Sequence, residues 1–265
     1  MHNGAVRIGS TMMDYVCFGK GEKKLVMLPG LSDGLATVRG KALPLSLSYR
    51  IFSKDYTVYM FSRKRQMHTG YTIREMAEDQ AQAMRALHIQ QADVLGVSQG
   101  SMIAQYLAID HPELVRKLVL AVPAARVNPV IEKNLSRWIS YAADGEYGKL
   151  MKDTAEKSYT GENLRRYSKI SGLLGKVFHP KEADRFLINA EAILTFNALD
   201  ELDQITCPTY VIAGGEDKTV GTEAAYEIYE RIPHCTFGYY PDYGHAVYEE
   251  AKDFNERVYH WLMKE

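Results

Sequence analysis

Val94-Leu95-Gly96-Val97-Ser98-Gln99-Gly100 is the stretch of this chain that decides the fold. It begins with a short apolar run, typical of a buried strand, and an apolar helical pattern over 102–109 follows it. A strand that turns sharply into a helix with a serine at the turn is the context of a nucleophile elbow. Gly96 and Gly100 carry no Cβ, so neighbouring backbone can approach closely there. The pattern predicts that Ser98 presents its hydroxyl outside the sheet.

Similar apolar runs recur along the chain and alternate with helical patterns. The expected strands are residues 25–28, 56–61, 94–97, 118–122, 210–213 and 236–240, and the expected helices are 72–87, 102–109, 222–229 and 249–262. Thr72 and Glu75 have the spacing of a capping box at the start of the first helix. Short strands without polar alternation are typical of a buried parallel sheet. The order therefore predicts a doubly wound α/β sheet, with an antiparallel edge near 6–8 and 12–18.

One long segment interrupts this alternation. From residue 124 to 199 no strand pattern appears, and residues 129–142, 147–157, 163–174 and 181–198 favour helices. We expect a core formed by residues 1–123 and 200–265, with residues 124–199 as a helical cap over the sheet. Its aromatic residues could line a substrate pocket or simply pack in the core. The candidates for substrate contact are Trp138, Tyr141, Phe178 and Phe196, with Tyr159 and Phe186 beside them.

A serine nucleophile needs a base, and the base needs an acid to orient it. Asp217 follows the strand at 210–213, and His245 follows the strand at 236–240. Both therefore fall at the carboxyl ends of strands, where open α/β sheets bind ligands. The order Ser98, Asp217, His245 predicts a catalytic triad. Glu216 is adjacent to the acid, and Asp200 or Asp203 remain alternatives.

These motifs together resemble the α/β-hydrolase superfamily, and in particular its compact, capped bacterial members. The resemblance runs from about residue 23 to 262 and rests on four motifs: Leu28-Pro29-Gly30-Leu31, the 96–100 elbow, Cys207-Pro208 with Gly214-Gly215-Glu216-Asp217, and Gly244-His245. It implies the α/β-hydrolase fold, a mostly parallel central sheet with helices on both faces and a helical cap. It also implies that the backbone N–H groups of Leu31 and Gln99 form an oxyanion hole.

The sequence departs from this family at two places. Pro29-Gly30 stands where His-Gly is frequent, a change expected to affect only the support of the loop. The segment Phe61-Ser62-Arg63-Lys64-Arg65-Gln66 stands where the family often has Asp-x-Arg-Gly-x-Gly. Its three cations either favour an anionic group of the substrate near the entrance or form a solvated charge cluster.

Composition and charge limit the partners. The net charge of −1 gives no field that would attract nucleic acid or an anionic membrane surface. No apolar run approaches the roughly 18 residues of a membrane span, and the first ten residues lack a signal-peptide pattern. Three scattered cysteines, Cys17, Cys207 and Cys235, are expected to be free thiols in a reducing compartment. We expect a cytoplasmic protein without a metal or other cofactor, and the choice between monomer and homodimer is left open.

The resemblance and the three residues imply a serine hydrolase. We expect it to cleave a carboxylic ester or related acyl bond of a small molecule through an acyl-enzyme on Ser98. The same triad serves lactonases, amidases, carbon–carbon bond hydrolases and acyltransferases, so these activities stay open. A small-molecule receptor without efficient turnover is the alternative outside enzymes.

Overall fold

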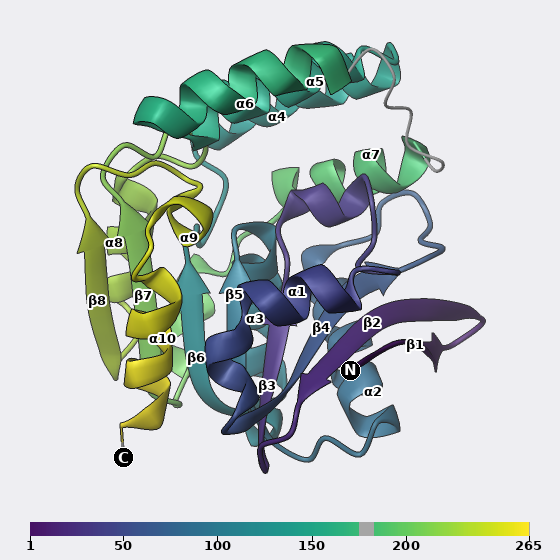
Figure 1. Cartoon of the computed structure of the whole chain (residues 1–265), viewed down its shortest axis with the longest axis vertical. Helices are drawn as coiled ribbons and strands as arrows, with labels where there is room; N and C mark the ends of the chain where they lie inside the picture. Colours follow the sequence, from purple (N-terminus) through teal and green to yellow (C-terminus); the bar gives the residue numbers. More distant parts are fainter. Residues whose placement is uncertain (175–182, 265) are drawn as a thin grey trace.

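Eight strands form one sheet, in the order β1-β2-β4-β3-β5-β6-β7-β8, in the computed structural model, which describes residues 1–174 and 183–264. The strands are β1 (His2–Ile8), β2 (Thr11–Gly19), β3 (Lys23–Leu28), β4 (Tyr56–Lys64), β5 (Ala92–Val97), β6 (Val115–Ala121), β7 (Thr209–Gly214) and β8 (Cys235–Tyr240). Pairing is parallel from β4 through β8, and β1 and β2 add the predicted antiparallel edge. The α/β-hydrolase fold is thus confirmed (Figure 1).

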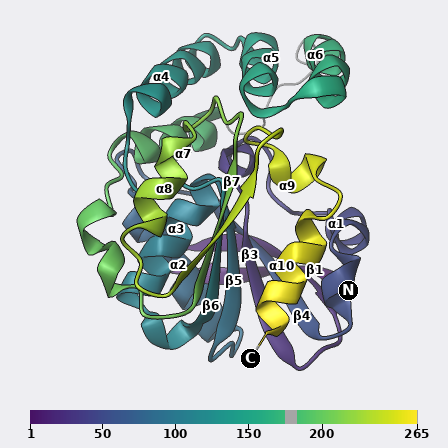
Figure 2. The same cartoon turned by 90° about the vertical axis from the view of Figure 1, so that its left-hand side faces the viewer.

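Both faces of the sheet are covered, which explains why its strands are apolar throughout. The helices α2 (Ile73–Ala86), α3 (Gln99–Asp110) and α8 (Glu223–Tyr229) lie on one face, and α1 (Ala42–Ser48) and α10 (Phe254–Met263) lie on the other (Figure 2). Alternate residues of each strand enter two separate cores. In β3, for example, Val26 packs beneath α2 and α3, whereas Met27 packs toward α1. Among the described residues, no helix is long and apolar enough to cross a membrane.

Local signals placed several helix ends correctly. The backbone N–H of Thr72 donates to Glu75 Oε2 at 2.8 Å, and the N–H of Glu75 donates to the Thr72 hydroxyl at 3.2 Å, so the capping box is confirmed. The last predicted helix is instead two: α9 (Val247–Glu250) and α10. The chain is extended at Ala251, with ψ of 114°, which ends α9. Helix α1 was not expected. The described connections also contain the short 3₁₀ helices η1 (Leu31–Gly34), η2 (Arg50–Ser53), η3 (Pro112–Leu114) and η4 (Leu199–Gln204).

Among the described residues, the segment between β6 and β7 is mostly helical, as expected, but its last helix ends at Leu194 and not at residue 198. Its helices are α4 (Pro129–Ala143), α5 (Tyr147–Ser158), α6 (Gly161–Leu174) and α7 (Ala183–Leu194). Figures 1 and 2 show α4, α5 and α6 in a layer beyond the carboxyl ends of the strands, with α7 between that layer and the sheet. Helix α7 also touches η1, where an added Cβ on Gly34 would lie 3.1 Å from the Cα of Phe186. The division into core and cap at residues 124 and 199 stays a prediction.

The turn from β5 into α3 is a place of very close backbone approach. Ser98 has φ of 53° and ψ of −120°, a conformation that L-residues rarely adopt. A Cβ on Gly96 would lie 2.4 Å from the carbonyl oxygen of Gly100, and a Cβ on Gly100 would lie 2.0 Å from the carbonyl oxygen of Leu28. The two glycines therefore allow β3, β5 and α3 to meet at the serine.

This contact predicts that Gly100→Ala is severely destabilising. The new methyl group would overlap backbone atoms that cannot move independently, so we expect a loss on the order of 3 kcal/mol in the free energy of unfolding. Gly70→Ala is the control, because Gly70 has φ of 79° but nothing within 4 Å of the added Cβ. That change should cost about 1 kcal/mol from backbone strain alone. Urea unfolding curves measure both values; equal losses would contradict the steric explanation.

Candidate active site

Ser98, His245 and Asp217 lie in one hydrogen-bonded row. The Nε2 atom of His245 is 2.8 Å from Ser98 Oγ, and its Nδ1 atom is 2.7 Å from Asp217 Oδ2. His245 and Asp217 are buried, and Ser98 is partly exposed at the end of β5. The structure thus brings the three predicted residues together in the order that nucleophile, base and orienting acid require.

The loops after β7 and β8 make this row possible by packing tightly on each other. A Cβ on Gly214 would lie 2.4 Å from the carbonyl oxygen of Gly244, next to His245. A Cβ on Gly215 would lie 2.4 Å from the carbonyl oxygen of Pro241. Because neither glycine has a side chain, the acid and the base approach each other from adjacent strand ends.

The Asp217 carboxylate is fixed by its own loop. Its second oxygen, Oδ1, accepts the backbone N–H groups of Thr219 at 2.8 Å and Val220 at 3.0 Å. The alternative acids are elsewhere: Asp200 is an exposed partner of Arg231, and Asp203 is exposed. The geometry therefore favours Asp217 as the acid that contacts His245.

Leu31 and Gln99, the predicted oxyanion residues, each begin a helix. Leu31 is the first residue of η1, and Gln99 is the first residue of α3. First-turn N–H groups have no acceptor within their own helix, so both remain available to a ligand. Gly30, which precedes Leu31, is close enough that an added Cβ would lie 3.3 Å from the Cβ of Ser98. The two N–H groups are thus carried by segments that both adjoin the serine.

A cavity of about 310 Å³ opens above Ser98 and His245. Its other lining residues are Gly30, Leu31, Ser32, Leu35, Trp138, Leu150, Met151, Thr154, Ala155, Ser158, Tyr159, Tyr167, Phe186, Thr219 and Tyr248. Apart from His245, none of these described residues has an ionisable acid or base of the Asp, Glu, Lys, Arg or His type. The site is therefore suited to a neutral, largely apolar ligand.

Only some of the aromatic residues predicted to contact the substrate line this cavity. Trp138 lines this cavity, but Tyr141 is not among the described residues that line it. Phe196 is buried against Tyr106, with 5.3 Å between the ring centroids, so it serves the core and not the pocket. Phe178 lies outside the described residues. The lining of the cavity by helix α5 was not expected.

The sequence of α5 contains a pattern that agrees with its contribution to the cavity. Residues 150, 151, 154, 155 and 158 of α5 all line the cavity and repeat at the spacing of one helical face. The pattern identifies the buried face of α5. It does not say whether that face meets another helix or an open pocket, which depends on how α5 lies over the sheet.

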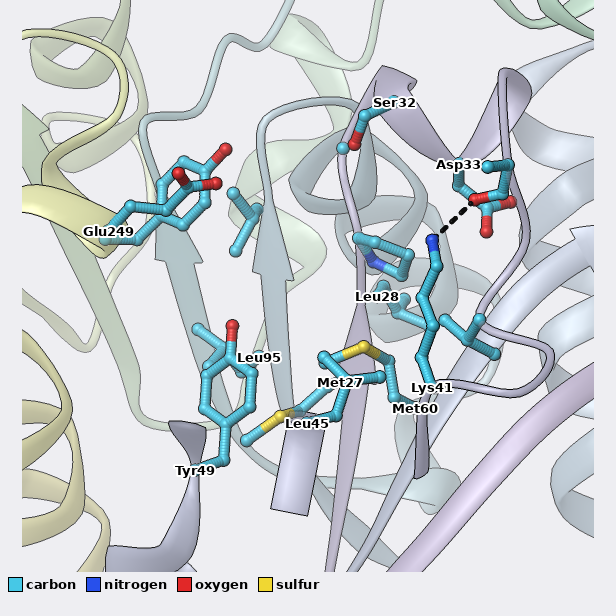
Figure 3. A pocket seen from close by; sticks show the side chains of 16 residues that line it. Met27, Leu28, Ser32, Asp33, Lys41, Leu45, Tyr49, Met60, Leu95 and Glu249 are labelled. Carbon is cyan, nitrogen blue, oxygen red and sulfur yellow. Dashed lines mark hydrogen bonds between the residues drawn. The ribbon is translucent and has the colours of Figure 1, made fainter. Parts of the chain in front are cut away.

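A second cavity, of about 290 Å³, shares Gly30, Ser32 and Tyr248 with the cavity above Ser98. Figure 3 shows it from close by. Its floor is apolar and includes Met27, Leu45 and Met60, and Lys41 Nζ at its edge donates to the carbonyl oxygen of Ala36 at 3.3 Å. Neither Ser98 nor His245 lines it. Ser98 and His245 both line the first cavity, and Ser98 also borders a small hollow of about 30 Å³ next to Met102.

The cationic segment at 63–65 differs from both expectations for it. Strand β4 continues to Lys64, because β2 pairs with it as far as Met13, and Arg63 is only 1% exposed. Lys64 lies 3.3 Å from Asp79 in an ion pair, and Arg65 lies 2.6 Å from Asp14. None of the three cations lines the cavity above Ser98. The expectation that they attract an anionic substrate group at the entrance is therefore wrong, and so is a fully solvated cluster.

Arg63 is instead part of a buried polar network behind the predicted oxyanion hole. Its Nη2 atom donates to Gln99 Oε1 at 2.8 Å, and its backbone N–H donates to Asp33 Oδ2 at 2.9 Å. Arg185 Nη2, from α7, donates to the same Asp33 oxygen at 2.7 Å. Sequence patterns gave no sign of this network, since its members come from segments up to 152 residues apart.

The charges of this network adjust each other's proton affinity. Burial alone would raise the pKa of Asp33, but the guanidinium groups of Arg185 and Arg63 outweigh it and hold that pKa below its ordinary value. Burial lowers the pKa of Arg63 to about 10, although Asp33 opposes the shift. At neutral pH the network therefore contains two cations and one anion.

The described residues offer no site for a metal ion: no three His, Cys, Asp or Glu side chains among them are grouped suitably. The cysteines are free, as expected, with Cys17 buried and Cys207 and Cys235 half-buried. Burial raises the pKa of the Cys207 thiol to about 11 and that of Cys235 to about 12, so neither is a ready thiolate nucleophile.

Comparisons with known proteins show which family this chain is similar to. The model of the family described as alpha/beta hydrolase fold matches residues 24–252. RutD of Caulobacter sp. (strain K31), provisionally named a carbamate hydrolase, is 26% identical over 207 residues, covering 74% of each chain. The 3-oxoadipate enol-lactonase 2 of Acinetobacter baylyi is 23% identical over 71% of this chain and 70% of its own. The crystal structure of MGS-M2, an α/β-hydrolase enzyme from a Medee basin deep-sea metagenome library, superposes with a TM-score of 0.88 at 20% identity, covering 99% of this chain and 98% of that one.

The buried carboxylate predicts a pH-dependent stability. Asp33→Asn should lower the free energy of unfolding at pH 7 by about 3 kcal/mol, because two buried guanidinium groups lose their anion. The folded-state pKa of Asp33 is depressed, so this stabilisation is present above the unfolded value near 4 and is lost as pH falls through the folded value. The gap between wild type and variant should therefore narrow below about pH 4.

Denaturant unfolding at a series of pH values from 7 to 3 measures this gap. Asp200→Asn is the control, because the Asp200 side chain is 85% exposed and its ion pair with Arg231 should contribute little. A gap that stays constant over the whole range would contradict the assignment of the stabilising charge to Asp33.

Proposed function

The chain belongs to the alpha/beta hydrolase fold family, and from that premise we propose that it cleaves carboxylic esters or related acyl bonds of small molecules through an acyl-enzyme on Ser98. One observation carries the proposal: His245 lies within hydrogen-bond distance of both Ser98 and Asp217, at 2.8 Å and 2.7 Å. Such a row lets an imidazole accept the proton of the serine hydroxyl while a carboxylate stabilises the resulting imidazolium.

In the first half-reaction, Ser98 Oγ attacks the carbonyl carbon of the ester as His245 Nε2 takes its proton. The negative charge that develops on the carbonyl oxygen is stabilised by the backbone N–H groups of Leu31 and Gln99. His245 then returns the proton to the leaving oxygen, the ester C–O bond breaks, and an alcohol departs. Asp217 holds the imidazole in the required tautomer throughout.

In the second half-reaction, water attacks the acyl-enzyme. His245 removes one proton from that water, the same two N–H groups stabilise the second tetrahedral intermediate, and Ser98 leaves as the alcohol after taking the proton back. The products are one carboxylic acid and one alcohol for each ester and water consumed. No cofactor enters this balance.

The cavity supports a neutral substrate of modest size. Its walls combine the apolar side chains of Leu150, Met151 and Phe186 with a few hydroxyl groups, among them Thr154 and Ser158. An apolar wall offers no compensation for the desolvation of a charged group, so a carboxylate or ammonium on the substrate would be disfavoured in this cavity. We therefore propose uncharged acyl and alcohol groups.

A lactone is the second candidate. The support is the relative named 3-oxoadipate enol-lactonase 2, which matches 71% of this chain. A lactone is a cyclic ester, so the same nucleophile, base and oxyanion donors open it, and the alcohol formed stays attached to the acyl group. The resemblance to RutD likewise makes a carbamate worth testing.

Labelling with a fluorophosphonate tests the proposed nucleophile. An activated Ser98 should be phosphonylated with one equivalent of reagent, with loss of turnover of p-nitrophenyl acetate. Ser98→Ala should neither label nor turn over the ester beyond about 1/10⁵ of the wild-type rate. Ser46→Ala, a change at a half-buried serine on α1 that does not line the Ser98 cavity, is the control and should behave as wild type.

An unlabelled wild-type chain would overturn the serine-hydrolase proposal. Steady turnover with p-nitrophenyl esters would exclude the receptor alternative. Adding a lactone, a carbamate and a β-diketone to the ester panel separates the remaining reactions by their kcat/KM values.

Two apolar substitutions test which residues form the pocket. Met151→Ala enlarges the cavity and should raise the ratio of kcat/KM for p-nitrophenyl butyrate over acetate by about 4-fold to 15-fold, because each buried methylene group contributes about 0.8 kcal/mol. Phe196→Leu should leave that ratio unchanged and lower the free energy of unfolding by about 1 kcal/mol, because Phe196 packs in the core. A changed ratio in the Phe196 variant, with none in the Met151 variant, would contradict the assignment.

A further inference from the structure

We propose that Arg63 and Arg185, which share the carboxylate of Asp33, form a buried cationic clamp that positions both oxyanion donors. Because of this clamp, the two N–H groups keep the directions that an oxyanion hole needs only while α7 packs against η1. This inference rests on the proposed function, because it assigns the clamp to the acyl-transfer step at Ser98. Arg63 and Arg185 are positioning residues here, since they act through Gln99 and the η1 turn.

The first arm of the clamp fixes Gln99. Its side-chain oxygen accepts a hydrogen bond from Arg63 Nη2 at 2.8 Å, and its Nε2 atom donates to the backbone carbonyl of Asn189 at 2.7 Å. Gln99 is fully buried, so no water competes for these bonds. Both polar atoms of the Gln99 side-chain amide are thus held. The first peptide of α3 therefore has little freedom to rotate, and the N–H of Gln99 keeps one direction.

The second arm fixes the turn that begins with Leu31. Asp33, two residues later in η1, accepts the backbone N–H of Arg63 at 2.9 Å and Arg185 Nη2 at 2.7 Å on one carboxylate oxygen. Arg185 Nη1 also donates to the backbone carbonyl of Asp33. Both the side chain and the main chain of η1 are therefore tied to β4 and α7. Arg63 thus takes part in both arms.

The charge of the clamp is only partly compensated. Two guanidinium groups face one carboxylate, and Arg63 Nη1 lies 3.8 Å from Asp33 Oδ2. Within the described residues, Arg63 Nε and Nη1 and Arg185 Nε have no hydrogen-bond acceptor. Burying an incompletely paired cation costs several kcal/mol. The same charge becomes favourable when an oxyanion develops nearby, because a preorganised positive field in a water-poor site stabilises it.

Helix α7 supplies the part of the clamp that lies outside the sheet. Arg185 and Asn189 are four residues apart on α7, and Asn189 Nδ2 donates to the carbonyl of Arg185 at 2.7 Å. Gly34 gives α7 its close contact with η1, since an added Cβ would lie 3.1 Å from Phe186 Cα. Displacement of α7 would therefore break the bonds to Gln99 and to Asp33 together.

The test is Arg63→Met, which keeps most of the side-chain bulk and removes the guanidinium. The clamp acts on the tetrahedral oxyanion and not on the neutral substrate. We therefore expect kcat for p-nitrophenyl acetate to fall about 10-fold to 100-fold, somewhat less than the loss of a whole oxyanion donor, with KM within about 3-fold of wild type. Affinity for a boronic acid that forms a tetrahedral anionic adduct on Ser98 should fall by the same factor as kcat.

Arg116→Met is the matched control. Arg116, whose side chain is 37% exposed, also pairs with a buried carboxylate, that of Asp93 near the opposite end of β5 from Ser98. Its loss therefore leaves a buried carboxylate without its arginine away from the reaction. This variant should lose thermal stability and keep the wild-type kcat. All rates are divided by the concentration of sites that a fluorophosphonate titrates, so a smaller folded fraction cannot imitate a slower catalyst.

Three results would overturn the clamp: a wild-type kcat in Arg63→Met, a loss confined to KM, or an equal fall of kcat in Arg116→Met. If Arg63→Met does not fold, Gln99→Met tests the same link, because it keeps the peptide N–H while breaking the bonds to Arg63 and Asn189. It should show the same fall in kcat with little change in KM, and an unchanged kcat would overturn the clamp. Failure of the proposed function is a different result, namely no fluorophosphonate labelling of the wild-type chain.

Discussion

The close approach of α3 to the end of β3 is the constraint on which the rest of this site depends. A Cβ on Gly100 would lie 2.0 Å from the carbonyl oxygen of Leu28, so only glycine permits the two segments to meet. Because they meet, the chain leaving β3 passes beside Ser98, and the first residue of η1 comes to lie near the first residue of α3. The absence of a Cβ at Gly100 thus allows the proposed nucleophile and the two N–H groups to lie in one site.

Contacts from the helical segment between β6 and β7 restrain the loops that carry the proposed catalytic residues on two sides. The carbonyl of Ser158, at the end of α5, accepts the backbone N–H of Ala246 at 2.8 Å, and a Cβ on Gly244 would lie 2.7 Å from the same oxygen. This bond restrains the loop that carries His245. On the other side, α7 restrains η1 through Arg185. The helices that shape the cavity therefore also hold the loops beneath it, which links substrate fit to catalytic geometry.

Much of this arrangement could be predicted from local sequence. Most strand ends, the glycine-flanked serine and the order of acid and base follow from patterns a few residues long, whereas the end of β4 at Lys64 does not. The buried charges could not be predicted, because an arginine is stable in a core only when its partners are present. For Arg63 those partners are Asp33 and Gln99, 30 and 36 residues away. A run of three cations after an apolar strand looks like a surface loop until the pairing with β2 is known.

Phe196 and the cavity-lining face of α5 show that the roles of apolar residues are equally hard to predict from the sequence. Periodicity identifies a residue that avoids water, but a core contact and a pocket wall satisfy it equally. Phe196 meets Tyr106, whereas Met151 meets open space. Only the placement of each helix above the sheet separates the two cases, and that placement is set by contacts such as the one between α7 and Gly34.

The distribution of charge around Ser98 has a consequence for how binding energy is used. Apart from His245, the described walls of the cavity are neutral, and the buried cations Arg63 and Arg185 contact the segments of the proposed oxyanion donors without lining the pocket. A neutral ester gains little from that field when it binds, because it carries no net charge. The tetrahedral intermediate, with a full negative charge on its oxygen, gains the most. Interactions that are stronger in the transition state than in the ground state raise kcat, whereas uniform binding lowers KM. With buried cations behind the proposed oxyanion hole and apolar walls in front of it, the positive field stabilises the tetrahedral intermediate more than the bound ester. It would therefore raise kcat more than it lowers KM.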